Sequence, residues 1–170
     1  QARKPENIII GNNVWIHSYS IITAPSNDQN NIASNKTMIG EDHKNIVEIG
    51  DEVQIGLFNV INGIGGLSIG NCVTLSAYVS IYSATHLPNN PNDYSMKVGN
   101  NGMVSSRPVF SKQSNIIIGQ GAWLGLGVML ICASIGNDSF IKSATIVTKN
   151  IKENAVFGLN GYEADRYKES

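Results

Sequence analysis

The sequence is poor in charge and shows no excess of either sign. Charged side chains make up 15% of the 170 residues, and the formal net charge is −1. Nucleic-acid binding needs a basic face, and acidic tails show as runs of like charge. Neither pattern is present, so we expect no nucleic-acid partner.

Long apolar runs are also missing. No stretch approaches the roughly 18 apolar residues of a membrane span, and residues Gln1 to Pro5 lack the apolar core of a signal peptide. We therefore expect no membrane span and a cytoplasmic location. The length suits one domain covering residues 1–170.

Cysteine is scarce, which argues against a disulfide framework or a cysteine metal site. Cys72 and Cys132 lie far apart and match no C-x-x-C spacing. We expect both to be small, buried apolar residues.

What the sequence does contain is a six-residue period. An aliphatic residue is followed by Gly or another small or polar residue and then by four more positions, as in Ile49–Gln54 and Ile118–Trp123. The period occupies residues 10–21, 49–60, 69–86, 118–129 and 135–146. A fixed short period is typical of a β-solenoid, in which three hexads form one triangular coil and short parallel strands stack between coils.

The hexad also predicts which side chains fill the interior. The aliphatic residue and the fifth residue of each hexad point inward, and the other positions face solvent. The fifth residues are small, namely Val14, Ser20, Val53, Val73, Val79, Ala122, Val128, Ser139 and Thr145. Gly, Asn and Asp after the aliphatic residue suit left-handed or tight-turn backbone at the corners.

The period is interrupted at three places. Residues of about 25–47 and 87–115 form excursions, and long excursions from a compact domain are usually functional or disordered. The tail, about 152–170, loses the period. We expect it to cap the solenoid, with a strand at Ala155–Phe157 and a short helix from Tyr162.

Two motifs resemble a known family. Residues 82–88 read YSATHLP, in which a histidine ends a hexad before a proline-bearing loop, and the second motif runs from Ile118 through Trp123 to Asn150. Their order resembles the hexapeptide-repeat acyltransferases, particularly sugar O-acetyltransferases such as the maltose and galactoside enzymes. The resemblance implies an all-β, left-handed parallel β-helix, acetyl-CoA as co-substrate, and a homotrimer with sites between subunits.

His86 is the candidate general base. It ends its hexad, so we expect its side chain to point outward, where a ligand can meet it. Imidazole has an unperturbed pKa of about 6.5, which suits proton removal near neutral pH, and the resemblance implies this role. His17 and His43 lack the motif, and Asp93, a possible partner of the imidazole, lies in a polar loop that favours solvent exposure.

The resemblance also assigns roles around the acyl group. It places the Trp123 indole beside the acyl site and makes the backbone N–H of Leu126 the donor to the oxyanion. Packing against a neighbouring subunit is an equally good reading of Trp123. Trp15 has the same hexad position without the motif, so we assign it to packing, and exposed Tyr78 and Tyr82 are expected at the interface.

Coenzyme A is expected to lie between adjacent solenoids. Its pantetheine arm would pass the small residues Gly125, Ser143 and Ala144, besides Trp123 and Leu126. Thr148 and Lys149 fall where the family contacts the nucleotide phosphate, and a lysine supplies a point charge there. No metal is expected.

The resulting hypothesis is an acetyl-CoA-dependent O-acetyltransferase acting on a sugar hydroxyl of a surface polysaccharide or its precursor. A nucleotide-sugar N-acetyltransferase is the alternative within this fold, since the same base would serve an amine. A zinc-dependent β-helix hydratase would need three converging histidines, and a non-enzymatic solenoid would need a regular ladder on one outer face. The sequence has three histidines in all and shows no threonine ladder.

Overall fold

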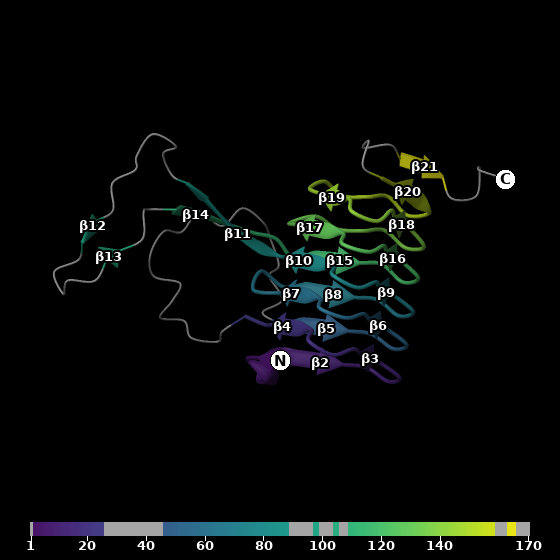
Figure 1. Ribbon diagram of the computed structural model, residues 1–170, viewed down its shortest axis with the longest axis horizontal. Helices are drawn as coiled ribbons and strands as arrows, with labels where there is room; N and C mark the ends of the chain where they lie inside the picture. The colour runs from purple at the N-terminus through teal and green to yellow at the C-terminus, as the bar shows by residue number, and fades with distance from the viewer. Residues whose placement is uncertain are drawn as a thin grey trace.

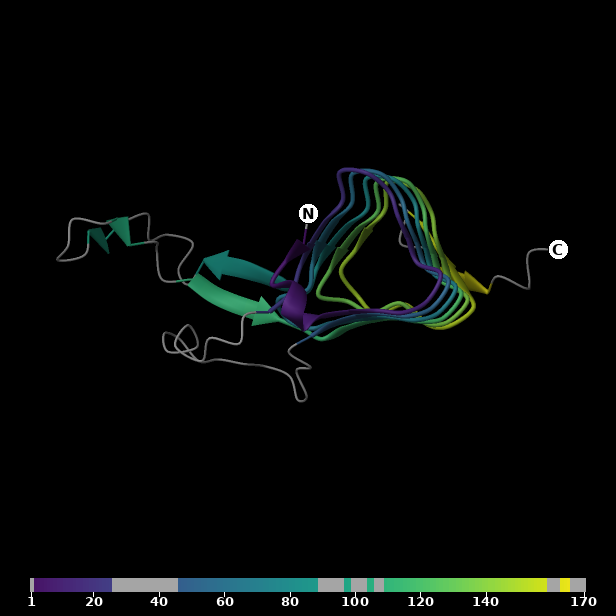
Figure 2. The same cartoon turned by 90° about the horizontal axis from the view of Figure 1, so that it is seen from below.

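The computed structural model is a parallel β-solenoid with a triangular cross-section (Figures 1 and 2). It describes residues 2–25, 46–88, 97–98, 104–105, 109–158 and 163–165. The coils stack from the purple N-terminal end in Figure 1 to the yellow C-terminal end, and each side of the triangle is one sheet.

Each sheet takes one short strand from successive coils. The β10 sheet contains β1 (Ala2–Arg3), β4 (Ile21–Thr23), β7 (Val60–Asn62), β10 (Ser80–Tyr82), β17 (Met129–Ile131) and β19 (Ile146–Val147). The β15 sheet contains β2 (Ile8–Ile10), β5 (Val47–Ile49), β8 (Leu67–Ile69) and β15 (Ile116–Ile118). The β16 sheet contains β3 (Trp15–Ile16), β6 (Gln54–Ile55), β9 (Thr74–Leu75), β16 (Trp123–Leu124), β18 (Phe140–Ile141), β20 (Ala155–Phe157) and β21 (Glu163–Asp165). A short 3₁₀ turn, η1 (Pro5–Asn7), precedes β2.

Aliphatic side chains stacked in register fill the interior. In the β16 sheet, Ile55 pairs with Ile16 on one side and Leu75 on the other, and Ile55 is fully buried. The predicted fifth residues are buried as well, apart from half-buried Val14. The hexad prediction of the core is therefore confirmed from the second coil onward, whereas Ile10 and Ile16 of the first coil are 48% and 39% exposed.

The corners have left-handed backbone, as the pattern predicts. Positive φ falls on the third residue after the aliphatic residue, for example Asn13 (55°) and Phe58 (58°). Gly56 directly follows the aliphatic residue Ile55, and a Cβ there would lie 2.7 Å from the carbonyl carbon of Ser76 in the next coil. Glycine is thus needed at this place for close packing of adjacent coils, not for left-handed backbone.

The second excursion begins earlier than predicted. β11 (Ala84–Pro88) pairs antiparallel with β14 (Val109–Gln113) to form an arm, and β12 (Lys97–Val98) pairs antiparallel with β13 (Val104–Ser105). At the point of exit, the Ser83 carbonyl accepts a hydrogen bond from Ser114 N–H at 2.9 Å, and Ser83 Oγ accepts one from Gly65 N–H at 2.8 Å. His86 lies inside β11, so the prediction that it ends a hexad is wrong.

The solenoid continues further than predicted at its C-terminal end. Ile151 bridges Ile135, and β20 pairs parallel with β18, which confirms the strand at Ala155–Phe157. Residues Glu163–Asp165 form β21, antiparallel to β20, so the helix expected from Tyr162 is wrong for these residues. Most of the first excursion lies outside the described residues.

One of the two cysteine predictions is wrong. Cys132 is buried, whereas Cys72 is exposed. Cys72 is the third residue after Ile69 and has a φ of 57°, so it occupies the outward-pointing corner position. Its thiol donates a hydrogen bond to Glu52 Oε2 at 3.4 Å.

Candidate functional site

Trp123 lies on the outer face of the β16 sheet. Its indole Nε1 donates a hydrogen bond to Ser76 Oγ at 3.2 Å in the coil before, and its ring meets Phe140 edge-on with centroids 6.1 Å apart. These two contacts fix the indole from both neighbouring coils, while 47% of the residue remains exposed. The side chain is therefore held in place and still open to a ligand.

The backbone amide of Leu126 is on the surface at the next corner. Leu126 N–H donates to Ser143 Oγ at 3.2 Å, and both residues are exposed. A hydroxyl that can rotate holds this amide, so a ligand oxygen can replace it without breaking the backbone ladder. The role of this amide as an oxyanion donor stays a prediction.

Small residues surround that amide. A Cβ at Gly125 would lie 2.7 Å from Ser143 N, and Ala144 occupies the left-handed corner position with a φ of 57°. Gly127 has open space where its side chain would be. Five predicted residues, Trp123, Gly125, Leu126, Ser143 and Ala144, thus come together on two adjacent coils.

Thr148 and Lys149 lie on a different part of the solenoid. They follow β19 in the β10 sheet, and both are exposed. Lys149 Nζ sits over the ring of Phe157, 5.3 Å from its centroid, which is a cation–π contact. The structure therefore does not bring these two residues beside Trp123, and their contact with a coenzyme stays a prediction.

The arm carries His86 away from Trp123 of the same chain. The arm leaves between β10 and β15, at the corner opposite the side formed by the β16 sheet (Figure 2). The backbone of His86 pairs with Ser111 across β11 and β14. Its role as a base stays a prediction, and His43 and Asp93 lie outside the described residues.

The rings of His17, Trp15 and Tyr78 stack on neighbouring rings of the same chain. His17 stacks on Trp15 with centroids 5.3 Å apart and planes 5° apart. Tyr78 stacks on Phe58 at 5.2 Å, so part of its ring is covered within the chain, and Tyr82 is half-buried in β10. An interface role for either tyrosine stays a prediction.

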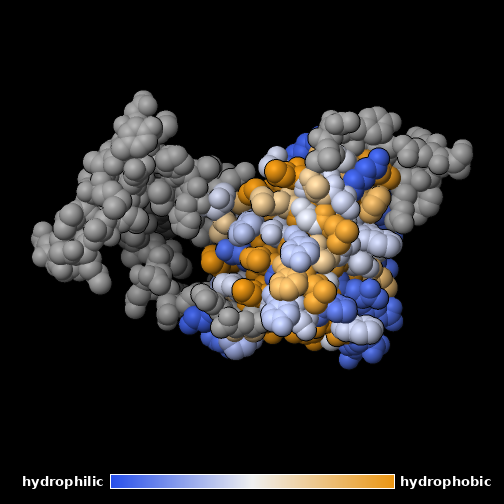
Figure 3. Space-filling model, in the orientation of Figure 1, coloured by the Kyte–Doolittle hydropathy of each residue, from blue (hydrophilic) through white to orange (hydrophobic). Residues whose placement is uncertain are grey.

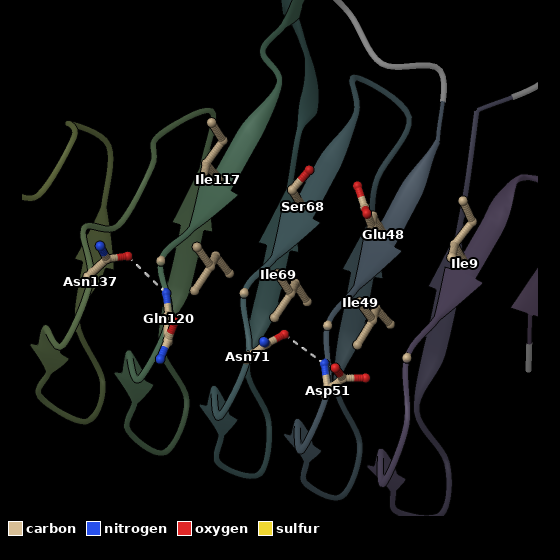
Figure 4. Close-up of a pocket in the computed structure, with 15 residues that line it drawn as sticks. Ile9, Glu48, Ile49, Asp51, Ser68, Ile69, Asn71, Ile117, Gln120 and Asn137 are labelled. Carbon is tan, nitrogen blue, oxygen red and sulfur yellow. Dashed lines mark hydrogen bonds between the residues drawn. The ribbon is translucent and has the colours of Figure 1, made fainter.

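A pocket lies elsewhere, along the outer face of the β15 sheet (Figure 4). Its polar side chains are used to join coils: Asn71 Oδ1 accepts from Asp51 N–H at 2.9 Å, and Asn137 Oδ1 accepts from Gln120 N–H at 3.0 Å. None of the predicted site residues lines this groove. We therefore place the candidate site on the β16 sheet, where fixed aromatic and amide groups converge.

Sequence reasoning missed two features of the β16 sheet. Ser76 accepts the hydrogen bond of the Trp123 indole. A small residue directly after an aliphatic one is ordinary in the hexad, so the sequence did not mark Ser76 as a site residue. The Trp15 and His17 pair lies on the same outer face as Trp123, a relation that the register of the coils could have revealed.

Membrane-spanning helices and metal-binding clusters are both absent from the described residues. No helix in this part of the chain is long and apolar enough to cross a membrane. Within the same residues, no three His, Cys, Asp or Glu side chains are grouped to hold a metal ion.

The fold is shared with solved acyltransferases, although no family model and no curated protein sequence matches the chain. AntD from Bacillus cereus, an N-acyltransferase solved with dTDP and 3-hydroxybutyryl-CoA, is 15% identical over 96% of this chain and 74% of its own, with a TM-score of 0.70. A maltose O-acetyltransferase from Clostridium difficile is 20% identical over 97% of this chain and 62% of its own, with a TM-score of 0.55. Perosamine N-acetyltransferase from Caulobacter crescentus, solved with CoA and GDP-perosamine, is 13% identical over 96% and 52%, with a TM-score of 0.59.

These likenesses define the fold class. The chain is a left-handed parallel β-helix, as the motif resemblance implied. The neighbours include enzymes that acylate nitrogen and one that acylates oxygen, so the fold is compatible with either acceptor atom.

Proposed function

We propose that this protein transfers an acyl group from coenzyme A to a sugar. The observation that carries the proposal is the cluster on the β16 sheet, where a fixed indole and a backbone amide held by one side-chain hydroxyl lie together among small residues. The motif order of the sequence and the CoA complexes of the structural neighbours support it.

The reaction needs a base, an oxyanion donor and a leaving thiolate. His86 takes the proton of the acceptor hydroxyl as that oxygen attacks the thioester carbonyl. The Leu126 N–H stabilises the oxyanion that forms, and removal of one such donor typically slows a reaction by about 10² to 10³. The intermediate then expels the CoA thiolate, which takes the proton from His86, leaving an ester and free CoA.

Acetyl is the proposed acyl group and a hydroxyl the proposed acceptor. The hexads that form the β16 face between β3 and β16, residues 14–18, 53–57, 73–77 and 122–126, contain no Asp, Glu, Lys or Arg. A nucleotide-linked sugar carries a diphosphate, which proteins usually bind with cationic side chains or helix N-termini. The stretch from β3 to β16 therefore suits an uncharged sugar or polysaccharide hydroxyl, whereas a nucleotide-linked amine would have exposed Lys142, one coil further along, as its cation.

The N-acyltransferase alternative has its own support, since AntD and the perosamine enzyme have this fold. Incubation with acetyl-CoA and matched panels of neutral saccharides, amino sugars and nucleotide-linked amino sugars separates the two. We expect ester formation on the neutral saccharides. Amide formation confined to nucleotide-linked sugars would replace the O-acetyl proposal, and CoA release with no acceptor of either kind would contradict both.

The site is proposed to form between copies of the chain in a homotrimer. The arm bearing His86 and the face bearing Trp123 belong to opposite sides of one solenoid, so a second copy is the simplest way to bring them together. Ser143 is small and exposed beside the Leu126 amide, so Ser143→Trp should block the coenzyme passage with little damage to the core.

A mixing experiment tests this arrangement. His86→Ala and Ser143→Trp should each be inactive as pure proteins, and subunits exchanged in equal amounts should recover about a quarter of the wild-type rate, because a site then needs one intact half from each variant. Binding of CoA should persist in His86→Ala and be lost in Ser143→Trp. A mixture that stays inactive, with sedimentation confirming subunit exchange, would place the whole site in one chain.

A further inference from the structure

One row of the β16 sheet runs between two tryptophans. Trp15, Gln54, Thr74 and Trp123 are Cα partners in successive coils. Neighbouring strands lie about 4.8 Å apart, so the row is about 14 Å long. The two tryptophans at its ends are 64% and 47% exposed.

A second row of small residues runs beside the first. Two positions along each strand, it reads His17, Gly56, Ser76 and Gly125. A Cβ at Gly56 or at Gly125 would lie 2.7 Å from backbone atoms of the next coil, so neither position can carry a side chain without movement. We call the strip between the two tryptophans the trough; its middle is formed by exposed Gln54, half-buried Thr74 and the small residues Gly56 and Ser76.

The chemistry of the trough is neutral and polar. Gln54 and Thr74 offer an amide and a hydroxyl, Ser76 offers a second hydroxyl, and the residues that build this face carry no Asp, Glu, Lys or Arg. Aromatic faces pack on apolar C–H surfaces, and neutral donors and acceptors pair with hydroxyls. Saccharides present both kinds of surface, and the nearest cation along the row is exposed Lys142, one coil beyond the Trp123 end.

Trp15 is also held in a form suited to binding. His17 covers one face of the indole, with the rings 5.3 Å apart and nearly parallel, and most of the indole remains exposed. A ring that is already ordered loses little conformational freedom when a ligand packs against it.

The geometry points to a second saccharide subsite at Trp15. The trough takes an uncharged oligosaccharide acceptor, with its reacting hydroxyl near Trp123 and Leu126 and a distal sugar unit against Trp15. This inference rests on the proposed sugar acyltransferase activity and adds the substrate class, an acceptor longer than one sugar. Trp15 is then a specificity residue, not a residue of general packing as its hexad position suggested.

The test compares acceptors of increasing length. Acetyl transfer from acetyl-CoA is measured on neutral gluco-, galacto- and manno-saccharides of one to four units, with wild type and Trp15→Ala. We expect kcat/KM to rise by about fivefold from the monosaccharide to the best longer acceptor, which corresponds to an aromatic contact of about 1 kcal/mol. Trp15→Ala should collapse this ratio through KM, with kcat much less affected.

Ile9→Ala is the matched control, because Ile9 lies in the same coil on the outer face of the β15 sheet and is 54% exposed. It should leave the length ratio unchanged. An unaltered ratio in Trp15→Ala, or no rise with length in wild type, would overturn the subsite while leaving the transferase proposal intact.

Binding without acetyl-CoA separates the two proposals. Saturation-transfer NMR with the same saccharides should show the distal unit in contact with protein in wild type and lose that contact in Trp15→Ala. Binding of this kind without acetyl transfer would contradict the transferase proposal alone. A change of sedimentation in Trp15→Ala would instead assign Trp15 to an interface between copies and overturn the subsite.

Discussion

Gly56 and Phe58 lie two residues apart at one corner, where the first position has no room for a side chain and the second carries a large ring. Gly56 has no room for a side chain, because backbone atoms of Ser76 and Ala77 crowd its Cβ position at 2.7 to 2.9 Å. Phe58 has positive φ, which is uncommon for a bulky residue, and its ring stacks between Tyr19 and Tyr78 at 5.0 and 5.2 Å. Aromatic pairs of this kind are worth about 0.5 to 1.5 kcal/mol, which offsets part of the backbone strain.

Gly56→Ala should be more destabilising than Gly127→Ala. The new methyl at Gly56 meets backbone that cannot rotate away, and overpacking of this kind costs about 2 to 3 kcal/mol. Gly127 has a φ of 66° and open space, so alanine there meets only the left-handed backbone penalty of about 1 kcal/mol. Guanidinium unfolding at one protein concentration measures the stability loss of both variants. Equal losses would contradict the role of Gly56 in close packing of the coils.

The Cys72 thiol should be slow to alkylate at neutral pH. The hydrogen bond to Glu52, followed by desolvation and the negative charges of Glu52 and Asp51, raises the pKa of Cys72 above its ordinary value. A raised pKa lowers the thiolate fraction at a given pH, and the thiolate is the nucleophile.

Glu52→Gln should therefore shift the pH profile of Cys72 alkylation to lower pH and speed the reaction near pH 7. Mass spectrometry of the peptides distinguishes Cys72 from buried Cys132, which serves as the internal control. An unchanged profile would remove Glu52 as the cause.

Strands of this solenoid are too short to be stable alone and depend on the strands above and below. Ile55 in β6 and Ile16 in β3 occupy one inward row, yet Ile55 is fully buried and Ile16 is 39% exposed. Asn59 shows another dependence: its Oδ1 accepts from Val79 N–H at 2.7 Å in the next coil, while its own N–H is bonded to Ser20 Oγ at 3.3 Å in the coil before.

Ile55→Ala should cost about 2 to 5 kcal/mol of unfolding free energy, because the cavity is enclosed by coils on both sides. Ile16→Ala should cost clearly less, since part of that side chain already faces solvent. The denaturant midpoints of the two variants, measured at the same protein concentration, compare their losses of stability. A larger loss for Ile16→Ala would show that further structure covers the first coil.

The six-residue period determined the core but not the exit of the arm. Which residues face inward follows from local spacing, so Ile55 and Val79 were predicted from sequence and are buried. The exit at Ser83 depends on contacts with Gly65 and Ser114 from other turns of the chain, and the hexad continues past it without a visible break. The exposed corner position of Cys72 was missed because the pattern was read for interior positions only.

At the level of the whole protein, the solenoid and the arm are separable in structure. The chain crosses from β7 to β8 with four residues, Gly63 to Gly66, at the same corner where the arm replaces such a turn. The sequence of this turn can therefore be used to replace the arm.

Replacing residues 83–115 with Gly-Ile-Gly-Gly, the sequence of residues 63–66, should leave a folded solenoid that still binds CoA. Acyl transfer should fall to background because His86 is gone. Circular dichroism, calorimetric CoA titration and the transfer assay report the three outcomes. Retained transfer would contradict both the base and the site between copies.

The cluster on the β16 face could be predicted from sequence because two motifs, around Trp123 and Ser143, lie on consecutive coils. The relation of His86 to that cluster could not, because the arm that carries it leaves the solenoid at the corner opposite the β16 sheet. Apolar and polar side chains are intermingled on the solenoid face seen in Figure 3, so surface hydropathy does not by itself mark where copies meet.

The strands between Trp15 and Trp123 keep a constant register in the β16 sheet. The distance between the two tryptophans therefore changes only in steps of one strand spacing, about 4.8 Å, because each additional coil inserts one strand and leaves both tryptophans in place. Repeating residues 50–69 once after Ile69 would move Trp15 one strand spacing further from Trp123. Evolution can then change the acceptor length that such a protein prefers by gain or loss of a coil, while the residues at both tryptophans stay the same.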